Sequence, residues 1–151
     1  MHLGRRPDPP ARAELKAFRE KAQPLLNHRV LWFTDEQRQV IGQAFAEVVR
    51  DNQFTCYACA ILPNHAHLLV RRHAMKGESM IHLLRKRSQE ALLPQMPDNH
   101  PVWTASPLVF FKSTADHIRA CIDYILANYE KHHIAMDNWP FVTPYDGWGE
   151  F

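Results

Sequence analysis

The segment covering residues 54–71 constrains the fold more than any other part of the chain. Residues 54–61 (FTCYACAI) are rich in aromatic and small apolar residues, and residues 62–64 (LPN) are typical of a turn. In residues 65–71 (HAHLLVR), histidines alternate with apolar residues at the start of the segment. Side chains of a strand point alternately to its two faces, so His65 and His67 share one face while the apolar residues between and after them share the other. We therefore predict a β-hairpin whose return strand presents two histidines on one side.

Helix signals lie before and after this hairpin. Three polar residues are placed to cap the start of a helix. They are Thr34, which is followed by Gln37 three residues later, then Ser79, and then Ser113, which is followed by Asp116. We expect helices over residues 13–23, 35–51, 79–93 and 113–131, and further strands over 29–33 and 107–112. This order of elements predicts an α+β sandwich of the ferredoxin-like type.

Length and composition exclude several classes of protein. The 151 residues suit one domain, the net charge is only +2, and no apolar run approaches the ~20 residues of a membrane span. The opening residues lack the apolar stretch of a secretory signal, and three cysteines cannot all pair internally, which favours a reducing cytoplasm. We expect an arm with a short helix (1–28), a main domain (29–136) and an aromatic tail that packs on it (137–151).

Two histidines on one strand face are close enough to bind a single divalent ion. The alternative is that His65 and His67 are the solvated face of a half-buried strand. In the last helix, Tyr124 and Asn128 lie one turn apart and away from the apolar stripe of Ile118, Ile122, Ile125 and Tyr129. Tyr124 is either a boundary tyrosine with a wet hydroxyl or a nucleophile that acts beside a metal ion.

Other candidates have competing explanations. Cys56 and Cys59 could join the histidines in a zinc site, but residues three apart on a continuous strand point to opposite faces. Both thiolates could then reach one ion only through a bulge or turn, so we favour free buried cysteines. Trp103 could stack on unpaired bases, although aromatic residues here are more typical of a core. We interpret His132 and His133 as surface residues or partners of the helix dipole.

The sequence ILPNHAHLLV resembles the histidine-hydrophobic-histidine signature of single-tyrosine HUH transposases, the family with an IS200-like transposase domain. Further along, VW at residues 102–103 and DYILANYEKHHI resemble the tyrosine helix of that family. Tyr124 and Asn128 match the tyrosine and asparagine of the branch associated with repetitive extragenic palindromes (REP), while Tyr129 replaces its usual proline. The resemblance extends over residues 31–145.

The resemblance implies a ferredoxin-like or RRM-like antiparallel sheet, with helices packed on one face, that binds single-stranded or hairpin DNA in the nucleoid. His65, His67 and Asn128 would hold Mg²⁺ or Mn²⁺, and Tyr124 would attack a DNA phosphate, leaving a 5′-phosphotyrosine link and a free 3′-hydroxyl. Basic side chains would contact phosphates, or else form a solvated helix face. These are Arg71, Arg72, Arg85, Lys86 and Arg87.

The family's first strand has no clear counterpart here. Several explanations are open. Residues 29–33 could take the place of this strand, or a second copy of the chain could complete the sheet as a homodimer. Alternatively, the strand is missing because the start codon is assigned too late or because the copy is shortened. Two functions follow. One is a metal-dependent DNA strand transferase, and the other is a truncated or domesticated descendant that binds structured single-stranded DNA without cutting it.

Overall fold

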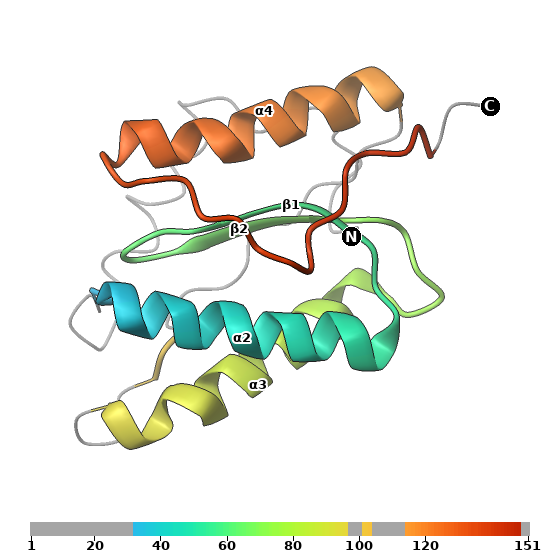
Figure 1. Ribbon diagram of the computed structural model, residues 1–151. Coiled ribbons are helices and arrows are strands. Elements are labelled where there is room, and N and C mark those ends of the chain that lie inside the picture. Colours follow the sequence, from blue (N-terminus) through green and yellow to red (C-terminus); the bar gives the residue numbers. More distant parts are fainter. Residues whose placement is uncertain (1–31, 97–100, 104–113, 149–151) are drawn as a thin grey trace, which may run out of the picture.

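The computed structural model describes residues 32–96, 101–103 and 114–148. The predicted helix over 13–23 and the predicted strand over 107–112 lie outside these residues. The described elements, in chain order, are α2 (Asp35–Asn52), β1 (Cys56–Ile61), β2 (Ala66–Val70), α3 (Gly77–Leu92), the 3₁₀ turn η2 (Leu93–Gln95) and α4 (Ala115–Lys131) (Figure 1).

Helix α2 begins where its capping signal predicts. The Thr34 side chain accepts a hydrogen bond from the Gln37 N–H, and the Gln37 side chain accepts one from the Thr34 N–H. These reciprocal bonds satisfy backbone donors that the first turn of a helix leaves without partners. The helix ends at Gln53, which adopts a left-handed conformation with φ of 56°. Trp32 and Phe33, the described end of the predicted 29–33 strand, are not in a strand, although the Phe33 N–H donates to the Pro63 carbonyl.

The starts of the other two helices differ from prediction. Helix α3 starts at Gly77, so Ser79 lies inside its first turn and the capping position is Lys76, which makes no side-chain cap. In α4 the cap is Thr114, whose side chain accepts from the His117 N–H, and not Ser113. Because Ser and Thr are both favoured at the N-cap, residue type alone does not decide between neighbouring candidates such as residues 113 and 114.

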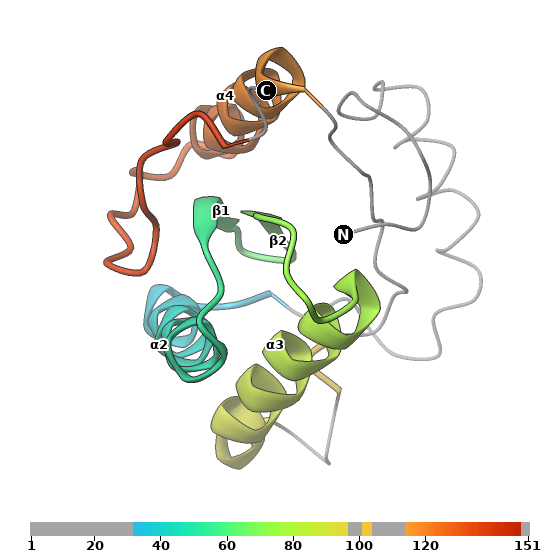
Figure 2. The same cartoon turned by 90° about the vertical axis from the view of Figure 1, so that its right-hand side faces the viewer.

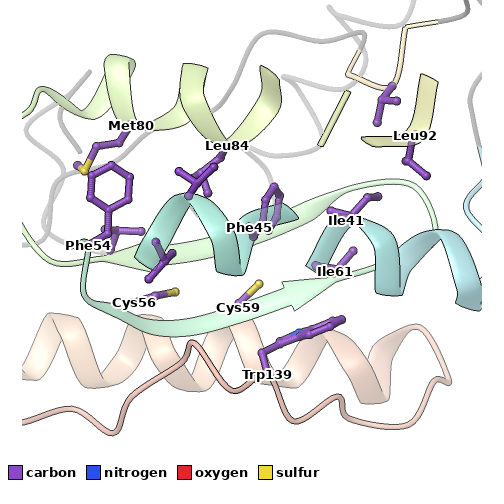
Figure 3. Close-up of a cluster of buried hydrophobic side chains, with 14 of the residues drawn as sticks. Ile41, Phe45, Phe54, Cys56, Cys59, Ile61, Met80, Leu84, Leu92 and Trp139 are labelled. Carbon is purple, nitrogen blue, oxygen red and sulfur yellow. The ribbon is translucent and has the colours of Figure 1, made fainter. Parts of the chain in front are cut away.

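Strands β1 and β2 form the predicted antiparallel hairpin, with Ala60 opposite His67 and Cys59 opposite Leu68. A bulge between Cys56 and Ala58 inserts an extra residue into β1. The bulge brings Cys56 and Cys59 into the same buried cluster, and Figure 3 shows both sulfur atoms on the same side of the strand. The alternation expected of a continuous strand does not hold here, because a bulge shifts it by one residue, but the prediction of free buried cysteines is confirmed.

The sheet lies between two helical layers. Helices α2 and α3 pack on one face and α4 covers the other (Figure 2). The α+β class with an antiparallel sheet is confirmed, but the helices are not all on one face as expected. The physical reason lies in β1, whose six residues are all buried and need apolar cover on both sides. Ile61 faces the α2 and α3 side, whereas Ala60 and Leu62 face α4.

The C-terminal segment 137–148 runs from the end of α4 back across the strands (Figure 1, red). Asp137 pairs with the buried guanidinium of Arg38 at 2.7 Å, and the same guanidinium donates to the Ile61 carbonyl. Trp139 is buried against α2, and its Nε1 donates to the Tyr129 hydroxyl of α4. The segment therefore ties the two helical layers together along β1.

Candidate functional site

His65, the residue before β2, and His67 within β2 both face the α4 side of the sheet. Their ring centroids are 4.9 Å apart with an interplanar angle of 84°. The apolar neighbours Ala66 and Leu68 pack on the opposite side, in the core beneath α2 and α3. The Nε2 atoms of both histidines are shielded from solvent. The hairpin thus holds two imidazoles side by side on one face of the sheet.

A hydrogen bond from the turn orients the first of these histidines. The Nδ1 of His65 lies 2.6 Å from the side-chain oxygen of Asn64. Because an amide oxygen can only accept, this bond places a hydrogen on Nδ1, and in the neutral imidazole Nε2 then keeps its lone pair. A second partner that fixes the tautomer in this way is typical of histidines that bind metal ions.

Helix α4 brings Tyr124 to the histidine pair. The Tyr124 ring contacts that of His67 edge-on, with centroids 5.9 Å apart and an interplanar angle of 83°. Tyr124 is half-buried, unlike Tyr129 on the same helix. Tyr129 is 2 % exposed, its hydroxyl donates to the Cys59 carbonyl, and burial raises its pKa to about 12. Of these two phenols, Tyr124 is the one whose ring contacts the histidine pair.

Asn128 lies one helical turn beyond Tyr124 and is buried. Its side-chain nitrogen donates to the carbonyl of Tyr124 at 2.9 Å and to that of Ile125 at 3.4 Å. This arrangement leaves the amide oxygen Oδ1 as the atom that can serve as a ligand. Asn128 also lies midway on α4 between Tyr124, which contacts His67, and His132, which contacts His65.

Two imidazole nitrogens and one amide oxygen form a donor set that suits a divalent ion. Across the described residues, histidine, cysteine, aspartate and glutamate form no group of three that could hold a metal ion. Asn128 belongs to none of these residue types, so the His65, His67 and Asn128 set is compatible with that result. The predicted third donor is an amide, a weaker ligand than a carboxylate.

The cysteines do not belong to this site. Cys56 and Cys59 are free and buried in the cluster beneath α2 and α3, whereas the histidine rings lie on the α4 side. Burial raises the pKa of the Cys56 thiol to about 12 and that of Cys59 well above its usual value. Thiols that resist ionisation are poor zinc ligands, so the rival zinc site is not supported.

The basic residues are divided between two places. Arg71 and Arg72 follow β2, where Arg72 is exposed and Arg71 lies 3.8 Å from Asp146 and against the Trp148 ring. The other three belong to α3, which lies on the opposite face of the sheet from α4, the helix that contains Tyr124 (Figure 2). Of these, Lys86 is exposed, Arg85 lies over Trp103, and Arg87 pairs with Glu47 of α2 at 2.9 Å.

Trp103 belongs to the core. It stacks on Phe45, contacts Phe33 edge-on, and donates through Nε1 to the hydroxyl of the buried Ser88. These contacts favour the packing interpretation over base stacking.

One residue at the site was missed in the sequence. His132 follows directly after α4, and its ring centroid lies 5.3 Å from that of His65. The sequence predicts it as a surface residue or a partner of the helix dipole. The signal that could have identified it is its spacing, two turns after Tyr124 and one after Asn128, which keeps it near the same helix face.

Comparison with known protein families gives one match. A family model described as "Transposase IS200 like" matches residues 25–128, more than half of the chain. Comparisons with curated proteins and with solved structures gave no match. Within the described part of the chain, no helix is both long and apolar enough to cross a membrane.

Proposed function

The chain belongs to the family of IS200-like transposases, and we propose that it cuts and rejoins single-stranded DNA by using Tyr124 as the nucleophile and His65, His67 and Asn128 as metal ligands. Membership of a transposase family implies DNA as the partner. The nucleophile, the metal dependence and the hairpin substrate are our proposal. Their main support is the contact between Tyr124 and His67, which brings a phenol from the last helix to a histidine pair on a distant strand.

The three proposed ligands come from two rigid elements. His65 and His67 are fixed by the β1–β2 hairpin, and Asn128 is fixed by its bonds to carbonyls within α4. A bound Mg²⁺ or Mn²⁺ would supply Lewis-acid polarisation of a phosphodiester oxygen. Ligands on rigid elements keep their geometry in the absence of substrate, which favours catalysis.

The proposed reaction is a transesterification. The Tyr124 Oη forms a bond to phosphorus and the bond from phosphorus to the 3′-oxygen breaks. The phenolic proton passes to water, and the departing 3′-oxygen takes up a proton to become a 3′-hydroxyl. The downstream DNA remains attached to Tyr124 through its 5′-phosphate, and the reverse reaction with another 3′-hydroxyl rejoins the strand. The His67 ring, packed against Tyr124, limits the positions that the phenol can adopt.

For DNA contact we propose the exposed Arg72 and Lys86 first, because both are charged and open to solvent. Arg71, Arg85 and Arg87 contribute after exchanging their present contacts with Asp146, Trp103 and Glu47. Phosphate contacts of this kind make binding weaken as salt rises. Tyr124 followed by Asn128 leads us to propose hairpins of REP type as the substrate.

A covalent-adduct assay tests this function. The full chain is mixed with single-stranded hairpin DNA from its own flanking sequence, labelled at either the 5′ or the 3′ end, with Mn²⁺ or with chelator. We expect the 3′ label to move with the denatured protein and the 5′ label to appear in a shorter free strand. This difference identifies a 5′-phosphotyrosine link, because only the downstream fragment stays on the protein.

Three variants complete the assay. Tyr124→Phe and His65→Ala should form no adduct, whereas Tyr145→Phe is the matched control, since Tyr145 is also half-buried but its hydroxyl donates to the Trp148 carbonyl. An adduct that persists in Tyr124→Phe would refute the assigned nucleophile. Tight hairpin binding with no adduct from any variant or the parent would instead support a DNA-binding protein that does not cut.

A further inference from the structure

The end of α4 is anchored on both sides of His132. The His132 N–H donates to the Asn128 carbonyl at 3.0 Å, and the next residue, His133, has a φ of 56° and donates to the Glu130 carbonyl. The Ile134 N–H then returns to the Tyr129 carbonyl, and the Ile134 side chain packs on the core beneath α4. These bonds define the place of His132 relative to the helix.

From that place the His132 ring contacts His65. The centroids lie 5.3 Å apart with an interplanar angle of 66°, and the His132 Nε2 is shielded from solvent. His65 is thus held by Asn64 at Nδ1, by His67 on one side and by His132 on another. By contrast, the neighbouring His133 is exposed.

Helix α4 therefore meets β2 through two ring contacts eight residues apart. Tyr124 contacts His67 and His132 contacts His65, with Asn128 between them. A helix is stiff over this length, so a contact at one end influences the spacing and rotation at the other. Removal of the His132 ring would release both the His65 imidazole and the end of α4.

We infer that His132 is a positioning residue that holds the His65 imidazole, and with it the end of α4, in the geometry that binds the metal ion. The inference rests on the proposed function, because it assumes that His65 is a ligand. His132 is assigned this role and not that of a ligand, because no group of three histidines, cysteines or acidic residues in the described residues could hold a metal ion. Second-layer contacts to metal-binding histidines change metal affinity by about 10- to 100-fold.

Calorimetric titration of the full chain with Mn²⁺, without DNA, tests the inference. His132→Ala should weaken binding by about tenfold, while His132→Phe, which keeps a ring but has no nitrogen, should stay close to the parent. His133→Asn is the matched control, because asparagine tolerates the positive φ at that position. Thermal unfolding of each variant confirms that titrations are made on folded protein.

The metal-free protein provides a second measurement. In ¹⁵N–¹H spectra of the imidazoles, His65 should show the Nδ1–H tautomer in the parent and in His132→Phe, and averaged tautomers in His132→Ala. Unchanged affinity and tautomer in His132→Ala would overturn the inference, and so would equal loss in His132→Phe and His132→Ala. His65→Ala separates the proposed metal site from the proposed role of His132. Mn²⁺ binding that survives His65→Ala refutes the metal site, whereas the imidazole spectra of the His132 variants still decide whether His132 positions His65.

Discussion

Gly42 in the middle of α2 is the position where one added methyl group should test the packing of the C-terminal segment. A Cβ atom built at Gly42 would lie 2.2, 2.6 and 2.8 Å from three ring carbons of Trp139. Real Cβ atoms do not approach carbon so closely, and an indole ring is too rigid to yield at one corner. Gly42→Ala must therefore displace the whole ring or move the helix.

Two opposing effects set the magnitude. Alanine gains about 1 kcal/mol over glycine in a helix interior, because glycine loses more backbone entropy. Overpacking a filled site costs about 1–3 kcal/mol, and complete loss of Trp139 packing would cost about 3–5 kcal/mol. We expect Gly42→Ala to lower the free energy of unfolding by about 2 kcal/mol, which lowers the melting temperature by about 4–8 °C in a domain of this size.

A double-mutant cycle measured by urea unfolding makes the test specific. Once Trp139→Ala has removed the ring, Gly42→Ala should become stabilising by about 1 kcal/mol, because only the helix propensity remains. Gln43→Ala, at the exposed neighbouring position, should have the same small effect in both backgrounds. If Gly42→Ala stabilises the parent protein, Trp139 does not pack on α2 and the reasoning fails.

Three further outcomes can be measured on the same preparations. Asp137→Ala should destabilise by about 2 kcal/mol, because among the described residues the buried Arg38 then keeps the Ile61 carbonyl and the exposed Asp35 carboxylate as partners, and Asp137→Asn should cost less in the same urea titration. Iodoacetamide should label Cys56 and Cys59 only after unfolding, since both are buried with raised pKa values; rapid labelling of native protein would contradict this. Because burial raises the folded-state pKa of Tyr129 to about 12, its stabilising contribution is fully present below about pH 10, the unfolded value, and is lost as pH rises toward 12. Absorbance at 295 nm should show less of this late ionisation in Tyr129→Phe than in the parent, where burial raises the pKa of Tyr57 to about 12 as well.

Much of the local structure follows from the sequence alone. The Thr34 and Gln37 capping pair predicts the start of α2, and the alternation after the LPN turn predicts a strand with two histidines on one face. Such features depend on residues three or four positions apart, whose interactions form in nearly the same way in any fold. For the same reason Tyr129 is recognisable as a core residue and Tyr124 as a residue outside the core stripe.

The tertiary structure decides what these local patterns leave open. Periodicity shows that α4 has one apolar face, but not which face of the sheet it covers, and only that choice brings Tyr124 and His132 to the histidine pair. The bulge that puts Cys56 and Cys59 on one side is a feature of the pairing with β2, and the C-terminal segment bridges to Cys56 through Val142. Contacts between distant segments form only when the layers pack together, and the separate segments carry no record of how those layers are arranged.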